Sequence, residues 1–439
     1  MTSTSPPLLP LLLLLLLSLL PTHNAHNNNN NIIYFHGINK TMAFYYLWYD
    51  APPNNDDTNS IRKNTKGYSH WNHHILPHWN KDIAAQWPGI STQWIPPHDI
   101  HAPFYPARGP YSSRNSTILR SQFHEMRHAG IGIAIASWWG RVGVSAGDSQ
   151  GVLTDDALSL TLDAAHAAAL EAKRDGDSDS ILTTTVALHL EPYAGRTAAS
   201  TRADVMYLFE KFGNHPALFR GDKGRPLFFI YDSYHISSTD WADEISKLRG
   251  TPFDSIFFGL WLNRGDANAL ELGGFDGVYT YFASETVGYG SDRNNWNAMS
   301  HEAIQRGLGF SPSVSPGYDD TKIRPWNRAS FKARHNGETY KASWEAALSL
   351  SNSPTCVTIT TYNEWGEGTQ IESAVPRTID VDLLALNGNA LSREIRSKLQ
   401  LLNSNDAYDD YGMGGQNFYL DLTAQFSKRL AKNDDEGDL

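Results

Sequence analysis

The sequence contains a single cysteine, Cys356, and no long run of Lys or Arg. One cysteine cannot form an internal disulfide, so the fold has to be held together by its hydrophobic core. Lys and Arg together number 36 against 47 Asp and Glu, which gives a net charge of -11 over 439 residues. Because phosphate groups are bound by clustered basic side chains, this balance argues against an anionic membrane surface and predicts no nucleic-acid partner.

The N-terminal apolar segment, Leu8–Leu20, also lacks any Lys or Arg before it. Its length suits a signal peptide and is shorter than the roughly 20 residues of a membrane-spanning helix. We predict a signal peptide or an uncleaved type II membrane anchor over residues 1–25 and a polar linker over residues 26–41. The chain would then enter the secretory pathway, to the Golgi lumen or the exterior, and two glycosylation sequons, at Asn39 and Asn115, agree with that route.

Eight short apolar runs follow the leader and have the composition of β-strands. Most are almost continuously apolar, which is typical of parallel strands that are covered on both faces. We predict a single (β/α)8 TIM-type barrel over residues 42–430, with long loops at its C-terminal face, and an acidic tail over 431–439. A doubly wound open sheet is the alternative. The runs are Ala43–Trp48, Ile131–Trp138, Thr184–Leu190, Pro226–Tyr231, Ser255–Trp261, Gly277–Phe282, Gly309–Val314 and Cys356–Tyr362.

Helical patterns lie between most of these runs, and several open at a Ser, Thr or Asp suited to N-capping. The connection Asn263–Gly274 leaves room for only a short helix, whereas the first connection, Asp50–Asn115, is far longer than a simple loop. The helical patterns are Ser116–Ala129, Asp155–Arg174, Arg202–Gly213, Asp240–Arg249, Asn294–Gly307 and Lys341–Leu350.

Aromatic side chains and acids follow most of the predicted strands. In a barrel of this kind the functional groups lie at the carboxyl ends of the strands. The chain has 13 Trp and 20 Tyr, and such rings stack on the apolar faces of sugars while their N–H and O–H groups reach sugar hydroxyls. These ends therefore favour a carbohydrate ligand, although any single ring can instead belong to the core.

Glu364 and Glu367 follow the last predicted strand and are the candidate catalytic pair. Glycoside hydrolysis needs two carboxyl groups, one that protonates the leaving oxygen and one that acts on the other side of the ring. A spacing of three places both on one side of a helical turn, and Gly366 and Gly368 permit a tight backbone turn. The alternative for such a pair is a solvated helix face.

Histidines are dense in the long first connection, so a metal site has to be considered. His70 with His74, or His74 with His78, have helical spacing for two ligands, but Pro77 interrupts that helix and no His-Glu-x-x-His string is present. We predict no metal and no organic cofactor, and we interpret the histidines as polar sugar contacts or as a solvated loop. The cluster consists of His70, His73, His74, His78, His98 and His101.

Seven strings of residues, in order along nearly the whole predicted barrel, resemble glycoside hydrolase family 99, the endo-α-mannosidase family. The resemblance implies a retaining enzyme that hydrolyses an internal α-1,2-mannosidic bond in N-glycans or related mannans through a 1,2-anhydro sugar. Its partner would be a mannose-containing glycan. The strings are Phe44–Tyr49, His101–Pro106, Glu191–Tyr193, Gly274–Phe282, Pro312–Tyr318, Ile323–Asn327 and Asn363–Glu372.

The resemblance also assigns roles to particular residues. Glu364 would deprotonate the mannose 2-hydroxyl, and Glu367 would protonate the leaving group and later act as a base. Trp139 competes with Trp138, because adjacent strand residues point to opposite faces, and Tyr279 competes with Tyr281, because residues two apart share a face. The residues expected to form the wall around the reacting mannose are Tyr46, Trp138, Glu191, Tyr281 and Arg324.

Gly366 is a departure from the family pattern, which has a histidine between the tryptophan and the second acid. Losing that imidazole puts rate and specificity in doubt more than reaction type. Two rival functions follow from the sequence: a lectin-like barrel that binds mannosides without cutting them, and a hydrolase of another α-glycan.

Overall fold

The structure is a computed structural model that describes residues 32–52, 67–73, 76, 78, 80–86, 94–141, 152–175, 183–379 and 407–432. The predicted leader, the first part of the linker, His74 and most of the acidic tail lie outside the described residues. Among the helices that the structure does describe, none has the length and apolar character that a membrane crossing requires.

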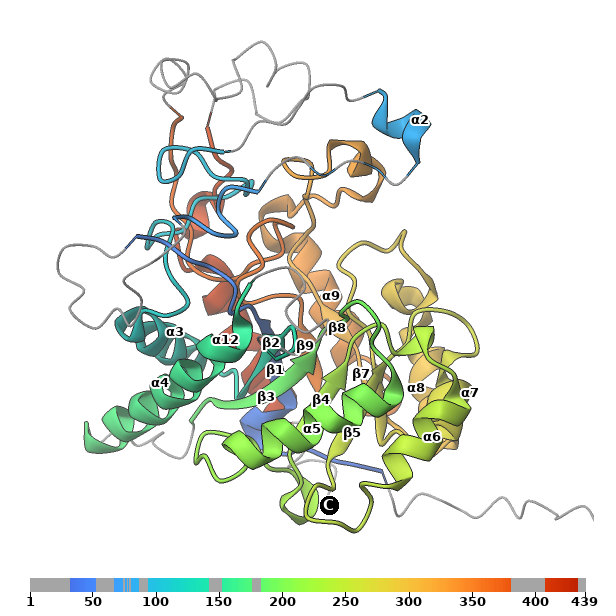
Figure 1. The fold of residues 1–439 in the computed structure, drawn as a ribbon. Helices are drawn as coiled ribbons and strands as arrows, with labels where there is room; N and C mark the ends of the chain where they lie inside the picture. The colour runs from blue at the N-terminus through green and yellow to red at the C-terminus, as the bar shows by residue number, and fades with distance from the viewer. Residues whose placement is uncertain are drawn as a thin grey trace, which may run out of the picture.

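Parallel strands form a nearly closed barrel, which confirms the predicted fold (Figure 1). The strand order is β7-β6-β5-β4-β3-β2-β1-β9-β8, and every neighbouring pair is parallel. The strands are β1 (Thr41–Tyr45), β2 (Ile133–Trp138), β3 (Thr185–Leu190), β4 (Leu227–Ile230), β5 (Ile256–Leu260), β6 (Gly277–Tyr279), β7 (Gly309–Ser311), β8 (Ser313–Val314) and β9 (Val357–Ile359).

Pro312 divides the predicted seventh strand into β7, which pairs with β6, and β8, which pairs with β9. Proline has no N–H to donate to a ladder, so the strand is interrupted there. Its carbonyl oxygen still accepts from Thr358 N at 3.0 Å. The two ends of the strand order are therefore joined through one short segment, and this segment closes the barrel.

Helices surround the strands, while irregular segments gather above the barrel in Figure 1. All six predicted helices form, and the short connection after β5 holds the short helix α7. Helix α5 begins earlier than predicted, because Thr197 caps it and exchanges hydrogen bonds with Ser200 in a capping box. The helices are α2 (Lys81–Ala84), α3 (Ser116–His128), α4 (Thr154–Arg174), α5 (Ala198–Phe212), α6 (Ser238–Ser246), α7 (Asp266–Leu272), α8 (Trp296–Gln305), α9 (Glu338–Leu348) and α12 (Phe418–Lys432).

Part of the predicted polar linker belongs to the barrel. Ile33 and Phe35 are buried in the core, and the Phe35 ring lies 5.6 Å from Phe219 and 6.3 Å from Phe258. The short 3-10 helix Gly37–Lys40 then leads directly into β1. The run Ile32–Phe35 is only four residues long and lies between polar residues, so it shows no periodic pattern and the sequence did not reveal this packing.

The barrel interior is filled largely by rings. Phe44 packs against Phe229 and Tyr279 at centroid distances of 5.9 and 5.8 Å, and Phe229 packs against Phe258 at 5.4 Å. Gly277 leaves the space for one of them, since a Cβ there would lie 2.5 Å from Phe258 Cζ. The interior is thus a packed core that supports the loops at the carboxyl ends of the strands.

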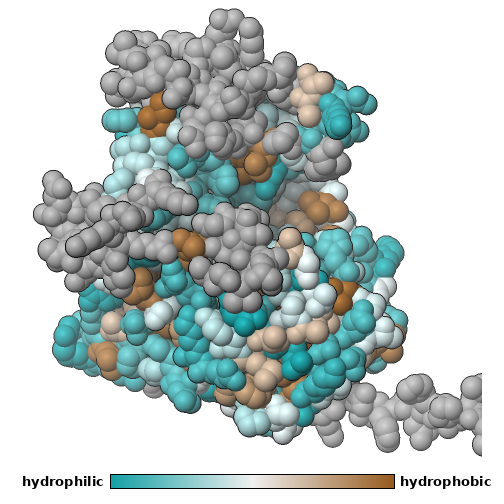
Figure 2. Space-filling model, in the orientation of Figure 1, coloured by the Kyte–Doolittle hydropathy of each residue, from teal (hydrophilic) through white to brown (hydrophobic). Residues whose placement is uncertain are grey.

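The face of the molecule in Figure 2 is mainly hydrophilic, with scattered hydrophobic residues and no broad apolar patch among the residues that are coloured. Scattered apolar side chains are normal on a soluble domain.

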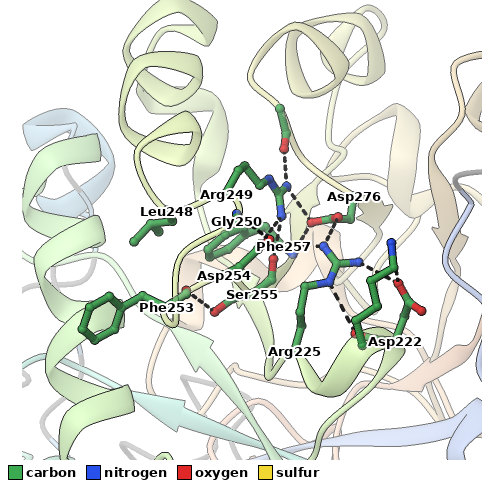
Figure 3. A network of polar contacts seen from close by, with 12 residues as sticks. Asp222, Arg225, Leu248, Arg249, Gly250, Phe253, Asp254, Ser255, Phe257 and Asp276 are labelled. Atoms are coloured by element: carbon green, nitrogen blue, oxygen red, sulfur yellow. Dashed lines mark hydrogen bonds and ion pairs between the residues drawn. The ribbon is translucent and has the colours of Figure 1, made fainter.

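A network of ion pairs holds the amino ends of β4, β5 and β6 together (Figure 3). Asp276 accepts from Arg225 at 3.0 Å and from Arg249 at 2.8 Å, and it also accepts from Phe257 N at 2.9 Å. A cavity of about 890 Å³ lies beside this network, lined by these charged groups. Since the charges of the network neutralise one another, we interpret it as a stabilising element at the end of the barrel opposite the strands' carboxyl ends.

We expect Asp276→Asn to lower the free energy of unfolding by about 2 kcal/mol, because two guanidinium groups lose the charge that balances them. Urea denaturation measures this change. The matched control is Asp243→Asn, an exposed partner of Lys247, which should cost less than about 0.5 kcal/mol. Equal effects of the two substitutions would contradict the structural role of the network.

Candidate active site

The loop after β9 is fixed to the end of β1 by the side chain of Asn363. Tyr46 N donates to Asn363 Oδ1 at 2.7 Å, and Asn363 Nδ2 donates to Tyr46 O at 3.0 Å. The amide therefore pairs with the backbone as another strand residue would. Tyr49 Oη also donates to Asn363 O at 2.8 Å. The residue that follows, Glu364, begins from a fully anchored backbone.

Trp365 is buried behind the acids and turns the loop. Its Nε1 donates to Glu372 Oε2 at 3.0 Å, and Glu372 is itself fully buried. Glu372 also accepts from Tyr111 at 2.7 Å, from Gln122 at 2.7 Å and from Arg108 at 3.1 Å. This buried network fixes the indole below the loop, so that the residues on either side of it can face the cavity.

Glu364 and Glu367 lie together at the carboxyl end of β9. Glu367 N donates to Glu364 Oε2 at 2.6 Å, and the chain turns immediately afterwards at Gly368, whose φ is +61°. Arg324 Nη1 lies 3.1 Å from Glu367 Oε1 and 3.1 Å from Asp320 Oδ2. The guanidinium of Arg324 therefore forms ion pairs with two carboxylates.

Burial raises the pKa of Glu364 well above its ordinary value, and the neighbouring charge of Glu367 raises it further. Burial also raises the pKa of Glu367, but Arg324 opposes that shift. The pair titrates as a unit. The proton of the pair consequently favours Glu364, because the guanidinium contacts Glu367.

The two acids open into a cavity of about 260 Å³. Trp48 forms a stack in its wall, with His70 at 4.4 Å and Trp139 at 5.9 Å between ring centroids. The phenol oxygens of Tyr46 and Tyr281 are hydrogen-bonded to each other. The lining residues are Tyr46, Trp48, His70, His73, Leu76, His101, Trp139, Glu191, Tyr231, Tyr281, Ile323, Arg324, Glu364 and Glu367.

Glu191 brings a third carboxylate to the cavity from the end of β3. Ser137 Oγ donates to its Oε1 at 2.8 Å, and His189 Nδ1 lies 2.9 Å from the same oxygen. His189 Nε2 in turn is 2.9 Å from Tyr279 Oη, inside the barrel. These contacts fix the orientation of Glu191 from below.

Six of the seven predicted site residues meet at this cavity, and Trp138 does not. As the last residue of β2, it points outward, and its Nε1 donates to Asp155 Oδ1 of α4 at 3.1 Å. Trp139 lines the cavity in its place. Of the second competing pair, Tyr281 lines the cavity, whereas Tyr279 lies fully buried in the barrel interior.

The sequence analysis gave no role at the cavity to Trp48 and Tyr231, although each is the last residue of a predicted strand, and it left the histidine cluster with two interpretations. His70, His73 and His101 reach the cavity, with His73 Nε2 lying 3.0 Å from His70 Nδ1. His78 instead packs against Trp326 at 4.5 Å. In the described part of the chain, no group of three or more His, Cys, Asp or Glu is arranged to hold a metal ion.

Comparison with known proteins gives consistent matches over most of the chain. Residues 38–387 match the model of glycosyl hydrolase family 99. Two mouse relatives are similar: a glycoprotein endo-alpha-1,2-mannosidase, 35% identical over 89% of this chain and 74% of its own length, and a glycoprotein endo-alpha-1,2-mannosidase-like protein, 34% identical over 90% and 77%. The structure of the endo-alpha-mannosidase from Bacteroides thetaiotaomicron superposes with a TM-score of 0.70 at 31% identity, covering 90% of this chain and 98% of that one.

The raised pKa of Glu364 predicts that this residue lowers stability at neutral pH. A carboxyl whose pKa is higher in the folded than in the unfolded state loses stability as the pH rises from the unfolded pKa through the folded pKa. We therefore expect Glu364→Gln to raise the melting temperature by a few degrees above that interval, with the gain disappearing below pH of about 4.

Thermal unfolding of both proteins across the pH range measures this difference. Glu210→Gln, at an exposed position on α5, is the control and should show no such trend. A Glu364→Gln protein that is less stable than the parent at every pH would contradict the raised pKa.

Proposed function

The chain belongs to glycosyl hydrolase family 99 and is a glycoside hydrolase, and from this premise we propose that it cleaves an internal α-1,2-mannosidic bond. The substrate would be an N-glycan or a related mannan, and the configuration at the anomeric carbon would be retained. The observation that carries the proposal is the pair Glu364 and Glu367, held side by side at a ring-lined cavity.

In the first step, the carboxylate of Glu364 takes the proton of the mannose 2-hydroxyl, and that oxygen attacks the anomeric carbon. The bond between the anomeric carbon and the leaving oxygen breaks, and Glu367 gives its proton to that oxygen. In an α-mannoside the axial 2-hydroxyl lies opposite the leaving group, so a 1,2-anhydro sugar can form. The two carboxyl groups at one cavity can supply the base and the acid that these transfers need.

In the second step, a water molecule attacks the anomeric carbon of the strained ring, and the bond between that carbon and the 2-oxygen breaks. Glu367, now a carboxylate, takes a proton from the water, and Glu364 returns its proton to the 2-oxygen. Glu191 and Arg324 would hold sugar hydroxyls through charge-assisted hydrogen bonds, and Trp48, Trp139 and Tyr231 would provide stacking surfaces.

The charges of the protein groups alone favour the opposite placement of the proton. Arg324 stabilises a charged Glu367, whereas the mechanism needs the proton on Glu367 when the glycan is bound. Engagement of Arg324 by sugar hydroxyls would remove part of that stabilisation. The assignment of acid and base therefore needs an experiment that treats the two carboxyls separately.

We expect Glu364→Gln and Glu367→Gln each to reduce turnover of a high-mannose glycan by about 10³-fold. A mannose-terminated α-glycosyl fluoride should restore much of the activity of Glu367→Gln, because fluoride leaves without a proton, and should not restore Glu364→Gln. Fluoride release and glycan digestion measure both effects, with Glu210→Gln as the control.

The reverse pattern of rescue would exchange the two roles. Unchanged glycan turnover in either variant would end the assignment of the catalytic pair. Tight binding of the glycan by the parent protein without any product would support a lectin-like barrel instead.

We also infer that the substrate is the glycan of a glycoprotein in the secretory pathway. The inference is supported by the names of the mouse relatives, by the apolar leader Leu8–Leu20 and by the two sequons. Mass measurement of the oligosaccharide released from a mixed glycan pool reports the cleaved linkage directly. A released single mannose, in place of a larger fragment, would contradict internal cleavage.

A further inference from the structure

Gly366 is a glycine for reasons of space. Its φ lies outside the left-handed region, so its backbone conformation is open to other residues. A Cβ at this position, however, would lie 2.8 Å from His101 Nε2 and 3.4 Å from Glu364 Oε1. The imidazole of His101 therefore occupies the volume that a side chain at position 366 would need.

His101 reaches this volume from the long connection after β1 and is held there by its surroundings. The residue is 2% exposed, and its backbone N–H donates to Trp71 O at 3.1 Å. The preceding residue, Ile100, donates its N–H to Tyr408 Oη at 2.7 Å. The ring also packs edge to face against His73, with centroids 5.4 Å apart. The imidazole is thus a fixed part of the cavity wall.

We propose that His101 is a positioning residue for Glu364, whose carboxyl it covers together with Gly366 so that water is kept away from it. The inference rests on the proposed function only in that Glu364 is taken as one of the two reacting carboxyls. Through His101, the long connection after β1 then acts directly on Glu364, the acid that follows β9.

The direction of that influence follows from the charge of the imidazole. Burial lowers the pKa of His101 well below its ordinary value, and the neighbouring His73 lowers it further, so the ring is uncharged. Removing an uncharged cover admits water to Glu364 and lowers the pKa of that carboxyl, whereas removing a positive charge would raise it. The other groups that act on the two residues are Glu367, Arg324, Lys322, Tyr46 and Tyr49.

The test compares His101→Gly, Gly366→His and the double variant with both changes. In protein labelled with ¹³C at the glutamate carboxyl, the Glu364 resonance is the one missing from Glu364→Gln. We expect its titration midpoint to fall by about one pH unit in His101→Gly and to return toward the parent value in the double variant, where the imidazole comes from the other side. A midpoint that is unchanged or higher in His101→Gly overturns the proposal.

Activity provides the second readout. We expect kcat/KM for the glycan to fall about tenfold or more in His101→Gly and in Gly366→His, and to recover most of the loss in the double variant. The limb of the pH profile that belongs to Glu364 should move to lower pH in His101→Gly. Additive losses in the double variant would overturn the proposal.

His98→Gly, an exposed position in the same connection, is the matched control and should leave the midpoint and kcat/KM unchanged. If His101→Gly fails to fold, His101→Asn keeps most of the volume, and its midpoint should lie between those of the parent and a solvated carboxyl. The titration reports on His101 whether or not the parent protein cuts mannosides. A failure of the proposed function would instead appear as a parent protein that releases no fragment from any mannose-containing glycan.

Discussion

The site depends on the amide of Asn363, which joins the end of the last strand to the end of the first. Between β1 and β9 the backbone leaves the ladder before the loop that carries Glu364 and Glu367 begins. By satisfying both the N–H and the C=O of Tyr46, the amide extends the β1–β9 pairing through a side chain. Without it, the buried N–H and C=O of Tyr46 would be left without these partners, at a cost of about 1–3 kcal/mol each. The position of the acids therefore depends on how the ends of β9 and β1 are held together.

The second constraint is the excess of negative charge around the cavity. Glu364, Glu367 and Asp320 lie near one guanidinium, that of Arg324, and burial raises the pKa of all three carboxyls. Such a group of carboxyls retains a proton at a pH where exposed carboxyls have lost theirs. That proton is what an acid and a base working in sequence need. Burial of these carboxyls destabilises the folded state. The stability therefore has to come from elements far from the cavity, such as the ion pairs of Asp276.

The fold could be predicted from the sequence to the extent that each element buries a regular pattern. The strands were visible because parallel strands covered on both faces are nearly continuously apolar, and the helices because capping residues mark their starts. What escaped prediction lacks such a pattern. Pro312 splits one strand for a local chemical reason, and Ile33 with Phe35 reaches the core from a segment that looks polar as a whole. The start of α5 depends on Thr197, a cap five residues before the position from which the helix was predicted.

The site was predictable where strands deliver the residues, and less so where loops do. Glu364 and Glu191 follow strands, and their convergence on one face follows from parallel pairing. Trp138 shows how far such a prediction reaches. Of two neighbouring residues at a strand end, only one points into the cavity, and the sequence does not show where the regular alternation of side chains stops. His101 shows a further limit. In the sequence, position 366 lacks the imidazole of the family pattern. The structure places another imidazole, that of His101, beside Gly366 from the first connection. A chemical group can be supplied to the same volume from two places in a chain, so the loss of a side chain at one position of a motif is not yet the loss of that group from the site.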